Sequence, residues 1–323
     1  MPARQQLDKW YFFGIIGAMP EYAMPPRQTE MSHAQSSGLD LRTDGEVLAL
    51  LATGQAEAAR CVAAAIPAMA EAARLMARSI AAGGRLIYAA AGSSGLMALA
   101  DALELPGTYG IARGQIEVVL AGGMAALEDM RGGPEDDAAA ARAAVEALRP
   151  GPRDCLIAVT ASGQTPFPLA AAEAARAAGA GTIGLANNAG AILFDRVDVG
   201  VCLESPAEVI AGSTRMGAGT AQKIALNMMS TLMAIRLGHV HDGYMVNVVA
   251  DNEKLRDRAR AIVEAVAGVG TGRADAALAA SAGAVKPAII LAAGARDAAA
   301  AKALLERFDG HVRPALAALR GEA

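Results

Sequence analysis

The stretch Leu86-Ile-Tyr-Ala-Ala-Ala-Gly-Ser-Ser-Gly95 sets the fold class of this chain. Its six opening residues carry no charge, which predicts a strand buried on both faces, as in a parallel sheet. The glycines and serines that follow permit a tight turn into a helix. A second stretch repeats this pattern, because the strand expected at 155–160 leads directly into Ser162-Gly-Gln-Thr-Pro166. Two such turns predict an α/β domain.

Working outward, further apolar runs alternate with Ala-rich helical stretches. Strands are expected at 116–121, 182–186 and 197–203, and crossover helices at 137–148 and 168–178. This alternation predicts a doubly wound, mostly parallel five-stranded sheet with helices on both faces. Ligands of such folds bind beyond the carboxyl ends of the strands. The two Ser-Gly turns are therefore the first candidates for a ligand site.

The flanking regions have other patterns. Residues 1–44 lack periodicity and are expected to form an N-terminal arm, followed by a main domain over 45–251. A helical pattern runs from 45 to 82. From 252 to 323 the pattern is wholly helical, which predicts a small C-terminal helical domain. In the region 45–82, one apolar stripe comprises Val62, Ile66, Met69, Ala73, Met76 and Ile80. In the region 252–323, breaks between helices are expected at Gly268–Gly272, Gly294 and Gly310.

The composition argues against nucleic acid and membrane partners. The net charge is −4, and a chain without a basic face is not expected to bind nucleic acid. The three cysteines are odd in number and widely spaced, which indicates buried apolar residues in a reducing compartment. The apolar run 10–19 is too short to span a bilayer. We therefore expect a cytoplasmic protein with no membrane partner, in which Met19, Met24 and Met31 are possible alternative starts.

The turns predict an anion site. Hydroxyls and backbone amides at helix N-termini suit one small dianion, and a phosphate monoester is the preferred ligand. The first turn lacks the lysine of a P-loop and the spacing of a dinucleotide fingerprint. A third cluster at 212–215 is expected to open a helix that runs to about Leu237. The plain alternative for each cluster is helix capping. The candidate binding residues are Ser93, Ser94, Ser162, Gln164, Thr165, Ser213, Thr214 and Arg215.

The residues 208–223, Glu-Val-Ile-Ala-Gly-Ser-Thr-Arg-Met-Gly-Ala-Gly-Thr-Ala-Gln-Lys, resemble the signature of N-acetylmuramic acid 6-phosphate etherases, which have the sugar isomerase (SIS) fold. The resemblance continues through Asn227-Met228 and Ser230-Thr231 and covers nearly the whole chain after residue 28. It includes Thr29-Glu30, Leu39-Asp40, 84–88 and 252–255. It implies that the main domain binds a phosphosugar.

The resemblance also implies a reaction. The family removes D-lactate from the C3 ether of N-acetylmuramic acid 6-phosphate and yields N-acetylglucosamine 6-phosphate, with no metal and no organic cofactor. The open-chain aldehyde acidifies the C2 hydrogen, a carboxylate removes that proton, an acid assists the loss of lactate, and water then adds. One carboxyl must be ionised and the other neutral, and unequal burial separates such pKa values.

Two glutamates match the family's catalytic positions. Glu104 lies in Glu-Leu-Pro-Gly-Thr108, and Glu135 lies in Gly-Gly-Pro-Glu-Asp136. Glu135 follows Glu104 by 31 positions, the family spacing. The resemblance assigns Glu104 as the acid that also guides water and Glu135 as the base. Judged by composition alone, either would be a surface carboxylate.

Several ligand-loop positions depart from the family pattern. Leu96 and Gln164 stand where the family has arginine, Gly217 stands where it has lysine, and Gly132 replaces a glutamate. The segment 242–247 also differs. A cation next to an anion contributes about 1.5–3 kcal/mol. The departures therefore bear on how the lactyl carboxylate is recognised, whereas hydroxyls and amides can still hold the phosphate.

Other functions stay open on this sequence. A phosphosugar aldose–ketose isomerase also needs a base at C2, and a non-catalytic sugar-phosphate regulator would not need the two glutamates.

His239 and His241 follow the helix expected to end near Leu237, where a cation is favourable, and no constellation of metal ligands surrounds them. The resemblance implies a homodimer with shared active sites, and the stripe over 62–80 is compatible with one.

Overall fold

A computed structural model of the chain describes residues 27–321. The apolar run 10–19 and most of the expected arm lie outside the described residues. From Arg27 to Thr43 the chain contains two short 3-10 turns, Gln28–Glu30 and Leu39–Leu41. The division into arm, main domain and C-terminal domain remains a prediction.

The central element is a parallel sheet, as predicted. Its five strands lie in the order β2-β1-β3-β4-β5, and all neighbouring pairs are parallel. The strands are β1 (Leu86–Ala90), β2 (Ile116–Leu120), β3 (Cys155–Val159), β4 (Gly181–Ala186) and β5 (Val199–Cys202). Continuous apolar runs form these strands because both faces of the sheet are covered.

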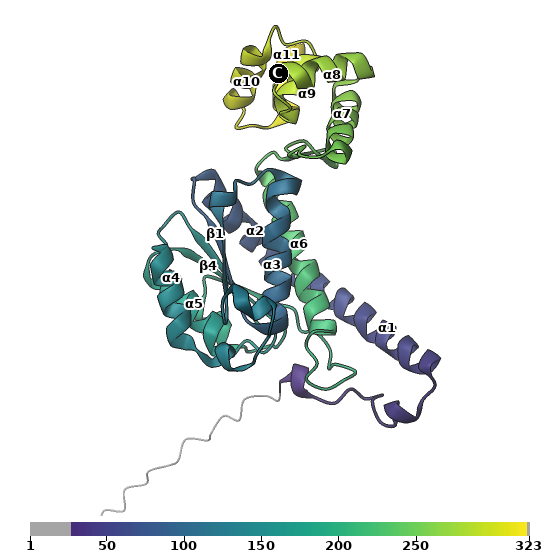
Figure 1. The fold of residues 1–323 in the computed structure, drawn as a ribbon, viewed down its shortest axis with the longest axis vertical. Coiled ribbons are helices and arrows are strands. Elements are labelled where there is room, and N and C mark those ends of the chain that lie inside the picture. Colours follow the sequence, from purple (N-terminus) through teal and green to yellow (C-terminus); the bar gives the residue numbers. More distant parts are fainter. Residues whose placement is uncertain (1–26, 322–323) are drawn as a thin grey trace, which may run out of the picture.

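Helices cover the two faces of the sheet unequally (Figure 1). The elements α2, α3 and α6 pack on one face, and α4 and α5 pack on the other. The side chains of β1 alternate accordingly, with Tyr88 in the first core and Ile87 in the second. The six α-helices between Asp44 and Arg236 are α1 (Asp44–Cys61), α2 (Ile66–Ala81), α3 (Gly92–Tyr109), α4 (Ala138–Leu148), α5 (Pro166–Ala177) and α6 (Gly217–Arg236).

The helical region predicted at 45–82 is two helices. A 3-10 segment, Val62–Ala65, separates α1 from α2. Because a 3-10 turn advances by a different angle per residue, it rotates Ile66 off the expected stripe, and Ile66 is 50% exposed. The other stripe residues are buried. Together 44–81 have the length and apolarity of a membrane span, and only 17% of the apolar window is buried, whereas α2 packs in the core on one face of the sheet.

Beyond β6 (Val240–His241) and β7 (Tyr244–Met245), the chain forms five helices around a core of their own. This confirms the helical C-terminal region. The predicted breaks occur, and one more falls at Gly283, whose φ of +81° suits a chain reversal. The helices are α7 (Glu253–Ala267), α8 (Thr271–Ala280), α9 (Val285–Ala292), α10 (Ala298–Arg307) and α11 (Val312–Arg320).

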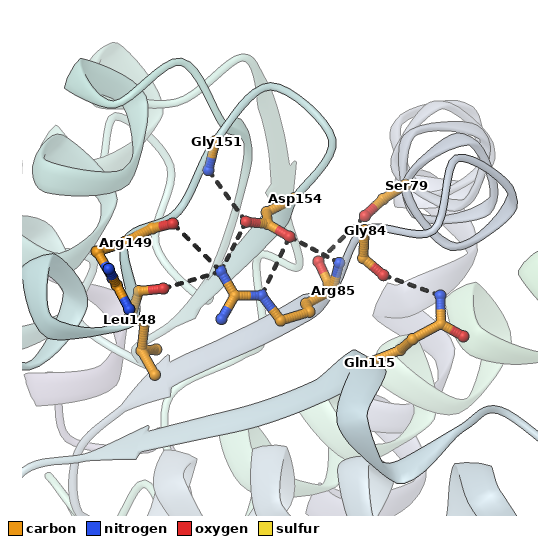
Figure 2. A network of polar contacts seen from close by, with 8 residues as sticks. All are labelled: Ser79, Gly84, Arg85, Gln115, Leu148, Arg149, Gly151 and Asp154. Carbon is orange, nitrogen blue, oxygen red and sulfur yellow. Dashed lines mark hydrogen bonds and ion pairs between the residues drawn. The ribbon is translucent and has the colours of Figure 1, made fainter.

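A polar network joins β1 and β3 at their amino ends, away from the ligand edge (Figure 2). The Arg85 guanidinium donates to both carboxylate oxygens of Asp154, at 3.2 and 2.9 Å, and to the Leu148 carbonyl at 3.0 Å. Burial would raise the pKa of Asp154, but hydrogen bonds from Arg85 and Gly151 lower it overall. A Cβ at Gly84 would lie 1.9 Å from the Arg153 carbonyl oxygen. The motif at 84–88 is therefore structural.

We expect Arg85→Met to lower the free energy of unfolding by about 2–3 kcal/mol, because it leaves Asp154 ionised and mostly buried without its partner. The pair is 23% and 10% exposed at its two side chains. Arg142→Met is the control, since its bond to Glu173 is exposed and should contribute less than about 1 kcal/mol. Urea unfolding measures both, and equal losses would contradict a structural role for the network.

Candidate functional site

The two Ser-Gly turns lie on either side of the point where the strand order reverses. The chain leaves β1 for β2 on one side and later returns through β3 on the other side. The carboxyl ends of β1 and β3 therefore flank a crevice, the usual ligand position in this topology. The structure thus places Ser93 and Ser94 beside the same crevice as Ser162 and Thr165.

The first loop begins α3 immediately after β1. Ala91 at the N-cap has no side chain that can accept a hydrogen bond, and no side chain within residues 27–321 caps the first-turn N–H groups. Ser94 is buried and Ser93 is half-buried in this first turn. Uncapped N–H groups beside two hydroxyls form the kind of anion site that the sequence predicted.

The second loop holds three hydroxyls together. Thr160 Oγ1 lies 2.8 Å from Thr165 Oγ1 and 3.3 Å from Ser162 Oγ, and Ser162 Oγ lies 3.2 Å from Thr165 Oγ1. Thr165 occupies the N-cap of α5 without capping it through its side chain, and Pro166 starts the helix as predicted. Because these hydroxyls contact one another rather than the helix N–H groups, capping alone does not account for them.

A pocket of about 290 Å³ adjoins the second loop. Ser162 and Gln164 line it, together with residues from the loops after β4 and β5 and from the start of the described chain. Asn187 and Asn188 lie on its wall and are buried. Asn188 Nδ2 donates to Thr29 Oγ1 at 3.1 Å, which ties the arm to the pocket. Sequence reasoning missed both asparagines, although a polar pair directly after an apolar strand was a usable signal.

Glu135 lies against the first loop. It belongs to the 3-10 turn Gly133–Asp136, and a Cβ on Gly92 would be 2.5 Å from its Oε1. Only glycine permits this approach, and its φ of +53° favours glycine too. Burial, and next the charge of Asp136, raise the pKa of Glu135. Leu96, one of the positions without the family's arginine, lines the same small depression.

Glu104 lies on α3, far from the first loop and from Glu135. It is 12 positions after Gly92, which is about 18 Å along a helix. Its side chain is 63% exposed and accepts from Lys223 Nζ of α6 at 3.2 Å. One turn earlier, buried Asp101 accepts hydrogen bonds from Tyr88 at 2.8 Å and Ser230 at 2.9 Å, which join α3 to β1 and α6. A single chain therefore does not bring the two glutamates together.

The third cluster differs from its prediction. The helix begins at Gly217 rather than at Ser213, because 213–216 form a turn in which Met216 N donates to Ser213 O. The buried Glu208 carboxylate accepts from Gly217 N at 2.9 Å and Ala218 N at 2.8 Å. This carboxylate occupies the anion position at the helix N-terminus. The turn itself contacts the arm, since Gly212 N donates to Thr29 O.

Arg215, in the same turn as Ser213 and Thr214, is exposed and forms no ion pair with any residue in 27–321. None of these three side chains lines the pocket beside Ser162. Within one chain the third cluster therefore does not line this pocket, although Gly212 N donates to Thr29, which is bonded to Asn188 on the pocket wall. At Gly217, which replaces the family's lysine, a Cβ would lie 3.1 Å from Ala58 Cβ and from Glu208 Oε2.

The expectation of a helix-end cation at His239 is wrong. Burial, and next the charge of Lys286, lower the pKa of His239 to about 4, so the ring is neutral at neutral pH. Burial lowers the pKa of His241 as well. The prediction of buried cysteines is confirmed for Cys155 alone, because Cys61 and Cys202 are half-buried. Burial raises the pKa of all three thiols, that of Cys61 to about 11.

Comparison with known proteins gives consistent results. The SIS domain family model matches residues 51–187. An N-acetylmuramic acid 6-phosphate etherase of Deinococcus radiodurans is 43% identical over 90% of this chain and 95% of its own length. A Streptomyces avermitilis protein of the same name is 40% identical over 90% of this chain and 93% of its own length. A solved phosphoheptose isomerase from Francisella tularensis covers 60% of this chain and 100% of its own, with 20% identity and a TM-score of 0.47.

Proposed function

The chain belongs to the family of N-acetylmuramic acid 6-phosphate etherases, and we propose that it cleaves the D-lactyl ether of that sugar in a site built from two copies of the chain. The observation that supports this arrangement is the separation of Glu135 and Glu104 along α3. An elimination needs both carboxyls at one sugar, but one chain places Glu135 beside the first residue of α3 and Glu104 about 18 Å further along that helix.

In the proposed site, one copy supplies the two Ser-bearing loops and Glu135. The phosphate takes the uncapped N–H groups of α3 and the hydroxyls of Ser93, Ser94, Ser162 and Thr165, with Gln164 beside them. Glu135 lies beside that anion position, because its carboxylate approaches Gly92 at the start of α3. A carboxylate close to the bound phosphosugar, with its pKa raised by burial, is suited to accept the C2 proton.

The second copy supplies Glu104. Around this glutamate, α3 and α6 expose large apolar side chains, which indicates a surface that another protein covers. These residues are Leu103 at 59%, Met228 at 40% and Ile235 at 46% exposure. An isologous contact through these helices would bring Glu104 of each copy toward the crevice of the other copy. The stripe over 62–80 does not serve this contact, because it mostly faces the core.

The chemistry then proceeds in three stages. The ring opens, and Glu135 removes the C2 proton that the aldehyde acidifies. Glu104 donates a proton to the C3 ether oxygen as the C–O bond breaks, and D-lactate leaves. Water adds to C3 of the unsaturated aldehyde, guided by Glu104, and C2 is reprotonated to give N-acetylglucosamine 6-phosphate. Lys223 Nζ lies 3.2 Å from Glu104 in the single chain, and this ion pair has to open before Glu104 can carry the proton that it donates.

Recognition of the lactyl carboxylate needs a cation in place of the family arginines missing at Leu96 and Gln164. Arg215 supports such a role, since it is exposed and belongs to the family signature. The turn that carries it lies outside the pocket of its own chain. We therefore place Arg215, with Ser213 and Thr214, among the groups that complete the site in the dimer.

Turnover of N-acetylmuramic acid 6-phosphate in deuterated water tests the proposal. We expect D-lactate release and one deuterium at C2 of the product, read by nuclear magnetic resonance and mass spectrometry. Conversion of an aldose 6-phosphate with a free C2 hydroxyl into a ketose that carries deuterium at C1, with no lactate released, would indicate an isomerase. Sugar-phosphate binding with neither signal would favour a non-catalytic regulator, which the missing arginines make the main competing function.

A further inference from the structure

A second cavity, of about 580 Å³, lies between the end of α3 and the C-terminal helices. Its walls come from the segment after β7, from α7 and α8, and from the start of α9. Much of the lining is apolar, for example Val249 and Leu278, and Asn247 and Lys286 are among its polar residues. None of the residues assigned to the phosphosugar site lines this cavity.

Lys286 is unusual in its surroundings. It is only 8% exposed, yet its ammonium forms no ion pair or hydrogen bond with any residue from 27 to 321. A Cβ on Gly310 would lie 3.3 Å from its Nζ. Burial lowers the pKa of Lys286 to about 8, with no carboxylate opposing that effect. A buried cation without a counter-charge destabilises the fold.

The groups next to Lys286 supply no negative charge that would compensate its ammonium. His239 and His311 lie close by, and both Lys286 and His311 lower the pKa of His239 after burial. Ala284 at the N-cap of α9 does not cap the helix through its side chain, so the positive end of the helix also adjoins the cavity. The nearby Asp275 is already paired with Arg260 at 2.6 Å.

We propose that this cavity binds a small organic monocarboxylate, whose anionic group pairs with Lys286 and whose apolar body packs against Val249 and Leu278. The apolar walls favour such a body over a sugar, which would leave hydroxyls without partners. A bound carboxylate would give the Lys286 ammonium a counter-charge, because Asp275, the acidic residue of the lining, is already paired with Arg260. The site is separate from the crevice between β1 and β3.

Isothermal titration calorimetry of the full chain with propionate, hexanoate and 3-phenylpropionate tests the site. We expect saturable binding of at least the larger acids and no binding of 3-phenylpropanamide, the neutral analogue. Lys286→Met should weaken binding at least tenfold, and Lys302→Met, which removes an exposed lysine of α10, should not. Equal binding by Lys286→Met and Lys302→Met, or no binding of any acid to the wild-type chain, would overturn the proposal.

Proton uptake by the wild-type chain keeps the test valid if Lys286→Met folds poorly, and the thermal midpoint of Lys286→Met adds a second test if it folds. At pH 8.5, where a lysine with a pKa of about 8 is partly neutral, binding to the wild-type chain should take up protons, which titrations in two buffers of different ionisation enthalpy detect. Without ligand, Lys286→Met should raise the thermal midpoint, since the uncompensated charge is removed. No proton uptake, or a lower midpoint in a folded variant, would count against a ligand-binding lysine.

Discussion

Replacing Glu135 by glutamine should reduce kcat/KM for lactate release by about 10³-fold with little change in the free energy of unfolding. Glutamine keeps the shape that fits against Gly92 but cannot accept the C2 proton. Exchange of the C2 hydrogen with deuterated water should fall by a similar factor, because it depends on the same proton transfer.

The matched control for this variant is Glu128→Gln, which alters an exposed carboxylate in the same segment between β2 and α4. It should retain near wild-type kcat/KM. If Glu135→Gln lost less than about tenfold in both lactate release and C2 exchange, Glu135 would not be the base. Urea unfolding of both variants separates a chemical defect from a folding defect.

Replacing Glu104 by glutamine should separate the two halves of the reaction. Loss of a general acid slows departure of the lactyl group by about 10²–10³-fold. The C2 hydrogen should still exchange with deuterated water, because Glu135 is intact. The unreacted substrate would therefore gain deuterium at C2 faster than lactate appears, which mass spectrometry of the remaining N-acetylmuramic acid 6-phosphate can follow.

Glu146→Gln, an exposed substitution on α4, is the control for Glu104→Gln and should leave both rates unchanged. Should Glu104→Gln lose exchange and release in parallel, the roles of the two glutamates would need to be reversed or shared. Lys223→Met is expected to have a smaller effect on lactate release than Glu104→Gln, since Lys223 acts only through that carboxyl.

Much of the fold could be predicted because its determinants are local. Continuous apolar runs identified the five strands to within two residues, and the alternation with Ala-rich helices identified a parallel sheet. The Ser-Gly turns followed from their position directly after strands. Pro166 marked the start of α5 because proline suits the first turn of a helix.

Other features depend on packing between distant segments and could not be predicted. The spacing of 31 positions between the glutamates gave no distance, since the end of α3, β2 and the loops on either side of β2 intervene. The start of α6 at Gly217 depends on Glu208, which no local rule identifies as its cap. His239 is neutral because it is buried beside Lys286, 47 positions later in the chain. Ile66 left its stripe because a 3-10 turn precedes it.

Co-production of Glu104→Gln and Glu135→Gln chains, each with its own affinity tag, tests the shared site most directly. Half of the dimers in an equal mixture are mixed, and each mixed dimer would contain one site with both glutamates and one site with neither. If Glu104 and Glu135 come from different copies, doubly tagged dimers regain activity, and the mixture shows about a quarter of the wild-type rate of D-lactate release. If both residues act within one chain, every site keeps one lesion, and the mixed dimers would be as inactive as the single variants.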